Sequence, residues 1–249
     1  MTTTPVVLLH AFPLDHRMWD DVTRGLSGAR QVLAPALPVP PGDDLPEPSL
    51  DAAADHVADI ARATGGPVVV AGLSMGGYVA LALLDRHPDV VAGLALVDTR
   101  ATADAPEAAA NRLRVADAVE AAGSVGPVRG NVDTLLGEST LAARPQVREQ
   151  VLGWIDEQDP ARVAWAQRAM AARPDRTEVL RAFTGPVTVV VGDEDTITGP
   201  DAAEHMVKTA EQSQLVVVPR AGHLSAVEDP AAVTTALAEL AQHVDTALA

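Results

Sequence analysis

An apolar, β-branched run that leads directly into a Gly-x-Ser-x-Gly motif constrains this chain more than any other feature. Residues 68–71 are predicted to form a buried strand, Ser74 stands between Gly72 and Gly76, and a long apolar helical pattern follows. A strand, a one-residue turn and a helix in this order form a nucleophile elbow, which exposes the central hydroxyl at the carboxyl edge of a sheet. The glycines allow the strand and helix to approach closely, and holding Ser74 in such a turn costs about 1–3 kcal/mol.

A glycine-rich turn after a strand is also typical of a phosphate-binding loop. No Lys follows the motif, and the chain contains neither G-x-x-x-x-G-K-[ST] nor G-x-G-x-x-G. The sequence therefore favours Ser74 as a nucleophile over a phosphate site at this turn.

A nucleophilic serine needs a base and a residue that orients the base. Residues 186–191 are predicted to form a strand that ends in Gly-Asp-Glu-Asp, and residues 215–218 form another that is followed by His223. Because the carboxyl ends of parallel strands lie at one edge of a sheet, both groups are expected near Ser74. The order of serine, acid and histidine along the chain also fits an elbow-type active site.

The histidine is easier to select than the acid. Of the seven histidines, His223 alone follows a strand and a short loop in the required chain order, and His10 is predicted to be a buried ring that bonds nearby backbone. Four carboxylates remain as the acid, because spacing alone does not separate them: Asp193, Glu194, Asp195 and Asp98.

These segments resemble the α/β-hydrolase superfamily over nearly the whole chain. The matching pieces are His-Ala-Phe-Pro at 10–13, Gly-Leu-Ser-Met-Gly at 72–76, Gly-Asp-Glu-Asp at 192–195, and Gly-His at 222–223. In that family the acid lies three residues after the strand-ending glycine, so the resemblance implies a catalytic set of Ser74, Asp195 and His223.

The resemblance also implies an oxyanion hole made of two backbone N–H groups. One belongs to Met75, directly after the nucleophile, and the other to Phe12, in the loop after the first strand. A helix N-terminus adds partial positive charge at such a site. Two departures concern this region: Ala11 stands where the family often has glycine, and the loop at 36–48 does not follow the family's pattern.

The segment 222–230 is similar to the small bacterial esterase and 3-oxoadipate enol-lactonase branch. The resemblance implies a serine hydrolase that cleaves small carboxylic esters or lactones through an acyl-enzyme on Ser74. Thioesterase or perhydrolase activity uses the same kind of site. A small-molecule binding or receptor protein with low turnover on the same fold is the alternative from a different class, and turnover of a simple chromogenic ester would distinguish it.

Composition limits the partners. The chain has 34 Asp and Glu against 18 Lys and Arg, a formal net charge of −16, which disfavours nucleic acid and anionic membrane. It has no cysteine, and no His, Asp and Glu cluster with zinc spacing, so we expect no metal or organic cofactor. The N-terminus shows no secretory pattern and no apolar run reaches about 18 residues, so we expect a cytoplasmic protein.

The predicted fold class is α/β, a doubly wound, mostly parallel sheet with a helical cap insertion. Helical patterns separate about six strands, which is typical of parallel α/β sheets. The first two strands of the family are expected to be absent. The strands are predicted at 6–9, 31–34, 68–71, 94–97, 187–191 and 215–218.

The β pattern disappears between about residues 101 and 182, where helical periodicity takes over. We therefore predict a core domain from residues 1–100 and 183–249 and a helical cap at 101–182 that shapes the substrate pocket. The bulkiest apolar residues of this cap, Trp154, Trp165 and Met170, are candidate pocket residues.

Overall fold

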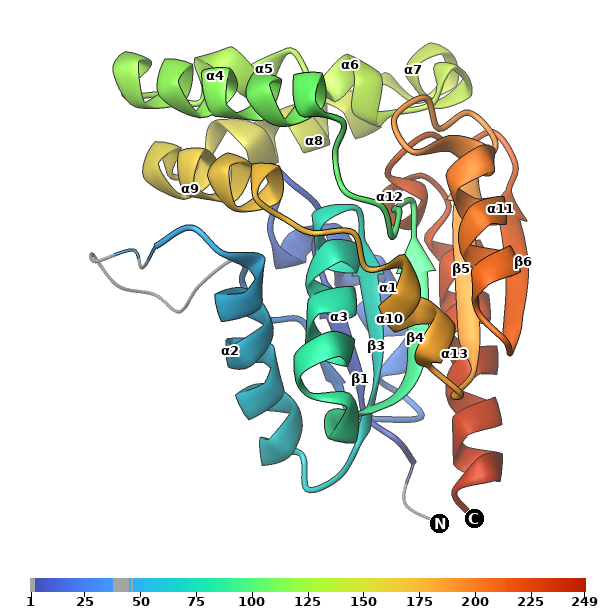
Figure 1. Cartoon of the computed structure of the whole chain (residues 1–249). Coiled ribbons are helices and arrows are strands. Elements are labelled where there is room, and N and C mark those ends of the chain that lie inside the picture. Colours follow the sequence, from blue (N-terminus) through green and yellow to red (C-terminus); the bar gives the residue numbers. More distant parts are fainter. Residues whose placement is uncertain (1–2, 38–44, 46) are drawn as a thin grey trace.

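A six-stranded sheet forms the centre of the computed structural model, which describes residues 3–37, 45 and 47–249 (Figure 1). Its strand order is β2-β1-β3-β4-β5-β6, and every neighbouring pair is parallel. The predicted doubly wound parallel sheet is confirmed, and no strand precedes β1 in the described residues. The strands are β1 (Val6–Leu9), β2 (Val32–Leu33), β3 (Val68–Leu73), β4 (Val91–Val97), β5 (Val187–Gly192) and β6 (Ser213–Val218).

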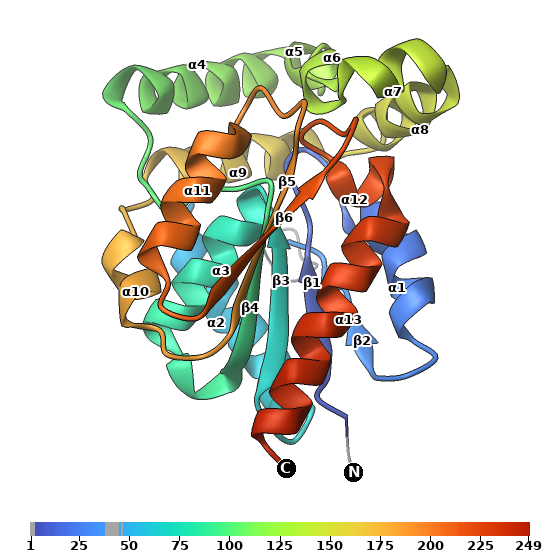
Figure 2. The ribbon, with the colours of Figure 1, turned by 90° about the vertical axis from the view of Figure 1, so that its right-hand side faces the viewer.

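Helices cover both faces of the sheet (Figures 1 and 2). Because successive strand side chains point to opposite faces, Val7 and Leu9 of β1 enter one core while Val6 and Leu8 enter the other. The first core lies under α2 (Leu50–Ala63), α3 (Met75–Arg86) and α11 (Gly199–Thr209). The second lies under α1 (Asp20–Leu26) and α13 (Pro230–Ala247). Burial on both faces explains the continuous apolar runs of the inner strands β1, β3, β4 and β5, whereas the edge strand β6 leaves Leu215 and Val217 exposed.

Capping residues fix the start of the two long flanking helices. The Ser49 side chain accepts a hydrogen bond from the N–H of Asp51 at the start of α2, at 3.1 Å. Asp229 accepts from the N–H of Ala232 at 3.0 Å, and Pro230 occupies the first position of α13. Such caps satisfy N–H groups that have no partner inside the helix.

The strand order reverses between β1 and β3, and this places the end of each strand beside a crevice. From β1 the chain moves to the edge strand β2, and from β3 it moves to β4 in the opposite direction. In open α/β sheets the crevice outside the carboxyl ends at such a reversal is where ligands bind. Phe12 follows β1 and Ser74 follows β3, so both lie at this point.

Residues 101–182 contain helices and no strand, as predicted. Most of these helices lie above the carboxyl edge of the sheet (Figures 1 and 2), but α10 packs beside the sheet against α3 and α11. The division into a core domain and a cap at 101–182 stays a prediction. The helices are α4 (Pro106–Ala122), α5 (Gly126–Arg129), α6 (Val132–Leu135), α7 (Glu138–Ala143), α8 (Pro145–Asp156), α9 (Pro160–Ala171) and α10 (Thr177–Ala182).

We expect Gly76→Ala to lower the free energy of unfolding by about 1–3 kcal/mol, because overpacking a tight contact has this order of effect. A Cβ at Gly76 would lie 2.0 Å from the carbonyl oxygen of Leu9, and the backbone of β1 has little room to move. Urea unfolding followed by circular dichroism measures the change.

The matched control is Gly153→Ala in α8, where a Cβ meets nothing within 4 Å. It should raise the free energy of unfolding by about 0.5–1 kcal/mol, since alanine favours a helix interior over glycine. Equal stability of the two variants would contradict the close contact between α3 and β1.

Candidate active site

Ser74 occupies the turn between β3 and α3 in a conformation that L-residues rarely adopt. Its φ is 54° and its ψ is −112°. Its N–H donates to the Val97 carbonyl of β4 at 3.0 Å, and its own carbonyl accepts from Gly77 N–H and the Thr99 hydroxyl at 2.9 and 2.8 Å. Neighbouring elements thus hold the strained turn in place, as strained positions require.

The structure brings Ser74, His223 and Asp195 into one chain of hydrogen bonds. His223 Nε2 lies 2.8 Å from Ser74 Oγ, and His223 Nδ1 lies 3.0 Å from Asp195 Oδ2. All three residues are buried, with exposed fractions of 8% for Ser74, 1% for His223 and 5% for Asp195. Each follows a different strand, so the sheet brings together residues that are far apart in the sequence.

Several donors keep the Asp195 carboxylate ionised and fixed. Burial opposes ionisation, but hydrogen bonds from His223, Thr198 and the Ile197 N–H hold the pKa of Asp195 below its usual range. The Thr198 hydroxyl donates to Oδ2 at 2.5 Å, and the Ile197 N–H donates to Oδ1 at 2.8 Å. A charged, oriented carboxylate beside a histidine is the arrangement that stabilises an imidazolium.

The four carboxylates that the sequence left open lie in different surroundings. Among the described hydrogen bonds, Asp195 is the one of the four that bonds His223. Asp193 is exposed and accepts from the Arg220 N–H, and Glu194 accepts from Ser139 at the start of α7.

Asp98 is fully buried and joins the two loops that carry Asp195 and His223. Its Oδ1 accepts from the Gly192 N–H at 2.9 Å, and its Oδ2 accepts from the N–H and hydroxyl of Ser225 at 3.0 and 2.6 Å. Burial raises the pKa of the Asp98 carboxyl to about 7. Asp98 therefore links the loop that carries Asp195 to the loop that carries His223.

A second buried carboxylate, Glu228, holds the histidine loop from the other side. Its Oε1 accepts from the Gly222 N–H at 2.8 Å, and its Oε2 accepts from the Gly137 N–H at 2.8 Å. Glu228 belongs to the short helix α12 (Ser225–Glu228), and Gly137 precedes α7 above the sheet. This carboxylate thus connects the loop before His223 to the overlying helices.

His10 is buried as a paired ring away from this chain of bonds. Its Nε2 accepts from the Leu37 N–H at 2.8 Å, and Nδ1 lies 3.0 Å from the Ala11 carbonyl. Burial lowers the pKa of His10, which favours the neutral ring that this pairing requires. The backbone-bonded role predicted for His10 matches these contacts.

The backbone N–H groups of Phe12 and Met75 lie at the same crevice. Met75 is the first residue of α3, and Phe12 follows β1 and precedes a cis peptide bond with Pro13. Neither N–H donates a hydrogen bond to any described residue. Phe12 and Ser74 line one cavity, whereas Met75 is absent from its described lining, and the oxyanion-hole role of the two N–H groups stays a prediction.

The cavity above Ser74 has a volume of about 270 Å³ and a mixed wall of apolar and polar side chains. Met170 lines it, whereas Trp154 and Trp165 are absent from its described lining. Trp165 is five residues from Met170 on α9 and points to a different side of the helix; both belong to the buried core, and Met170 is the one that also lines the cavity. The described lining is Phe12, Ser74, Tyr78, Ala108, Asn111, Arg112, Val115, Asn131, Thr134, Leu135, Gln167, Met170, Ile197 and His223.

The polar part of this wall, notably Arg112 on α4 and Gln167 on α9, was not among the residues predicted from the sequence. Helical spacing alone would have associated Gln167 with Met170, three residues later on the same face. No local pattern, however, indicates that α4 and α9 enclose the crevice.

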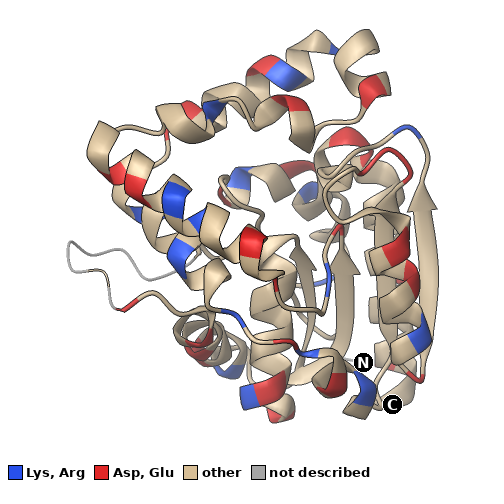
Figure 3. Ribbon diagram, turned by 45° about the horizontal axis from the view of Figure 1, so that its top comes forward, with Lys and Arg blue, Asp and Glu red and all other residues tan. Residues whose placement is uncertain are grey.

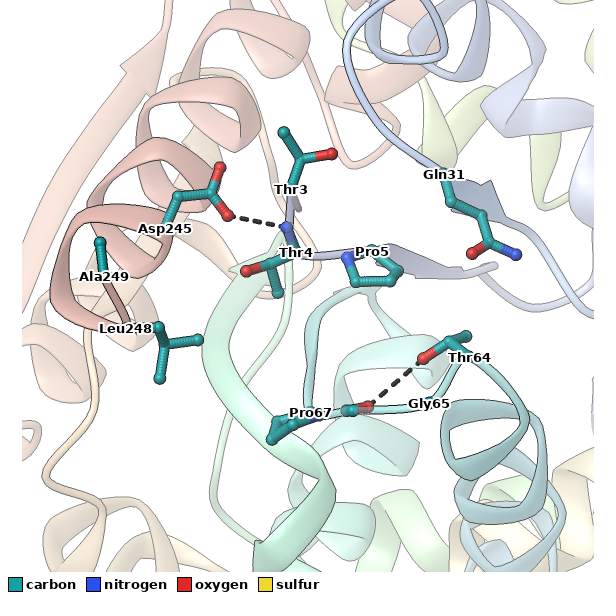
Figure 4. Close-up of a pocket in the computed structure, with 11 residues that line it drawn as sticks. Thr3, Thr4, Pro5, Gln31, Thr64, Gly65, Pro67, Asp245, Leu248 and Ala249 are labelled. Carbon is teal, nitrogen blue, oxygen red and sulfur yellow. Dashed lines mark hydrogen bonds between the residues drawn. The ribbon is translucent and has the colours of Figure 1, made fainter. Parts of the chain in front are cut away.

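A larger hollow of about 720 Å³ lies elsewhere, beside the chain ends, at the start of the strands (Figure 4). Thr4, Gln31 and Asp245 contribute to its wall, and Asp245 accepts a hydrogen bond from the Thr4 N–H at 2.7 Å. None of the predicted catalytic residues lines it.

Within the described residues, no cluster of three or more His, Asp and Glu side chains is arranged to hold a metal ion, and no helix is long and apolar enough to cross a membrane.

Known proteins resemble the chain over most of its length. The chain is 32% identical over 228 residues to a pimeloyl-[acyl-carrier protein] methyl ester esterase of Neisseria meningitidis, covering 88% of this chain and 86% of that protein. The structure of a thermophilic esterase from Thermogutta terrifontis, solved with malate bound, superposes with a TM-score of 0.90 at 41% identity. That match covers 98% of this chain and 91% of the esterase.

A more distant structure supports the fold. The enol-lactonase of Burkholderia xenovorans has a TM-score of 0.83 at 20% identity, over 96% of this chain and 92% of the lactonase. The sequence pattern of the alpha/beta hydrolase family matches residues 6–236. With the parallel sheet, the elbow and the esterase relatives, this match shows that the chain belongs to the alpha/beta hydrolase family.

Proposed function

We propose that this protein is a serine hydrolase that cleaves small carboxylic esters or lactones through an acyl-enzyme on Ser74. The observation that carries the proposal is the unbroken chain of hydrogen bonds from Asp195 through His223 to Ser74, which ends in a cavity of about 270 Å³. The match to the family and the similarity to esterases support the cleavage of an ester bond.

In the first half of the reaction, Ser74 Oγ attacks the ester carbonyl and His223 Nε2 takes the hydroxyl proton. Asp195, whose lowered pKa keeps it ionised, orients His223 and stabilises the imidazolium. The carbonyl oxygen gains negative charge, and the N–H groups of Phe12 and Met75 bind it at the positive end of α3. His223 then gives its proton to the leaving alcohol.

In the second half, water replaces the alcohol. His223 takes a proton from the water, the hydroxide attacks the acyl carbon, and the bond to Ser74 Oγ breaks as His223 returns the proton. The oxyanion forms and is bound a second time. Each such donor contributes about 10²–10³ in rate.

A fluorophosphonate should label Ser74 once per chain, because the base beside Ser74 Oγ activates that hydroxyl. Mass spectrometry of the digested protein should find the adduct on the peptide that contains Ser74. Ser74→Ala should abolish labelling and ester hydrolysis together. An adduct on another residue, or full labelling of Ser74→Ala, would remove Ser74 from the mechanism.

Asp195→Asn should lower kcat by about 10⁴, the size of the loss when a triad carboxylate becomes an amide. Asp193→Asn is the matched control: it lies in the same loop but is exposed and bonds only backbone, so kcat should change less than twofold. Steady-state kinetics on a p-nitrophenyl ester measures both. The reverse ranking, or a larger loss in Asp98→Asn, would assign the acid to another carboxylate.

Short or compact substrates should be preferred, because helices lie over the catalytic edge and the cavity is small. Values of kcat/KM for p-nitrophenyl esters from acetate to palmitate, beside a set of small lactones, should be highest at C2–C6 or at a lactone. A maximum at C12 or longer would refute the enclosed pocket.

A further inference from the structure

One wall of the cavity above Ser74 carries a positive charge. Arg112 of α4 is the one arginine in the described lining, and no Asp or Glu belongs to that lining. Its Nη1 lies 3.3 Å from Gln167 Oε1 and 3.5 Å from Met170 Sδ, and both of these residues also line the cavity. The guanidinium is therefore held at the cavity wall and is not free to turn outward.

The carboxylate behind Arg112 does not neutralise this charge, because two arginines share it. Asp104 accepts from Arg112 Nε at 2.6 Å and from Arg173 Nη2 at 2.8 Å. Burial opposes ionisation, but hydrogen bonds from Arg173 and Arg112 lower the pKa of Asp104 to about 2. Two cations and one anion leave one net positive charge in this cluster.

Arg173 brings its charge close to the cavity without lining it. Its side chain is 2% exposed, and its guanidinium lies 3.9 Å from the ring centre of Tyr78, which does line the cavity. A cation stacked behind an aromatic wall in a buried place adds to the positive potential in front of it. The excess charge of the cluster is thus directed at the catalytic cavity.

Gln167 supplies a second donor at the same wall. The residue is 5% exposed, and its amide oxygen is occupied by Arg112. Its amide nitrogen donates to no described residue, and it is not among the buried unpaired atoms of the described residues, so it is available to a ligand in the cavity. A guanidinium and an amide N–H₂ side by side form a donor pair that suits a carboxylate.

We infer that Arg112 and Gln167 form a carboxylate-binding subsite, so that the preferred substrates are esters or lactones that carry a free carboxylate. The inference rests on the proposed function, which gives the bond that is cleaved. It adds that the preferred substrate carries a negative charge. Residues of both signs of charge are spread along the ribbon (Figure 3), but the formal net charge of the chain is −16, so its overall charge does not attract anions. Affinity for an anionic ester must therefore come from this local cluster.

The test compares esters that differ only in charge. On the acyl side, monomethyl adipate is compared with methyl hexanoate, where a methyl group replaces the carboxylate, and with dimethyl adipate. On the alcohol side, 4-acetoxybenzoate is compared with 4-acetoxybenzamide. In at least one of the two series kcat/KM should be about tenfold or more higher for the anionic ester, which is the effect of one charge-assisted hydrogen bond.

Arg112→Met should remove this preference, by lowering kcat/KM for the anionic ester at least about tenfold more than for its neutral partner. Asp104 keeps Arg173 as its partner in this variant, so no buried charge is orphaned. Arg168→Met is the control, because Arg168 also joins α9 to α4, through Asp117 and Glu120, but is absent from the described lining. It should retain the preference for the anionic ester, and Gln167→Leu should reduce it.

Calorimetric titration with adipate separates this inference from the proposed function. Wild-type protein and Ser74→Ala should bind adipate, and Arg112→Met should bind it at least about tenfold more weakly. If neutral esters are hydrolysed at least as well as anionic ones in both series, or if Arg112→Met lowers both equally, the subsite is refuted. If no ester of either charge is hydrolysed, the proposed function fails, and adipate binding alone then tests the subsite. Equal binding by the wild type and Arg112→Met, or no binding by the wild type, overturns the subsite.

Discussion

The contact between the start of α3 and the end of β1 is the constraint on which the rest of the site depends. At Gly76 a side chain would meet the Leu9 carbonyl at 2.0 Å, and at Gly72 it would meet the Gly76 backbone at 2.2 Å. Only with both side chains absent can the chain turn within one residue. Ser74 then stands at the carboxyl edge with its φ at 54°, directly before the N-terminus of α3.

Buried carboxylates hold the other two members of the candidate active site in relation to Ser74. Asp98 bonds the backbone at Gly192 and Ser225, and Glu228 bonds the backbone at Gly222 and Gly137. Loops on their own are mobile, whereas proton transfer needs heavy atoms within hydrogen-bond reach. These two braces explain how loops from separate strands keep Asp195, His223 and Ser74 in one bonded chain.

The overlying helices give the cavity its chemical character, while the sheet and its loops supply the reacting groups. Arg112 comes from α4 and Gln167 from α9, and the shared carboxylate of Asp104 leaves their wall positively charged. The same arrangement of strands therefore serves different substrates when the helices above it change, as family folds commonly host many activities. In this chain the proposed reacting groups and the proposed carboxylate subsite lie on different layers of the structure.

The sequence by itself determined the six strands, the flanking helices, the elbow and the choice of His223, because each depends on local periodicity or on a short motif. It left Asp98, Asp193, Glu194 and Asp195 equivalent in spacing, and only the family resemblance favoured Asp195. The tertiary structure separates them, since hydrogen bonding to His223 depends on how two loops of distant strands approach. It also decided which residues of α9 meet the cavity, and so placed Met170 and Gln167 in its lining but not Trp165, because that choice depends on helix packing across long sequence separations.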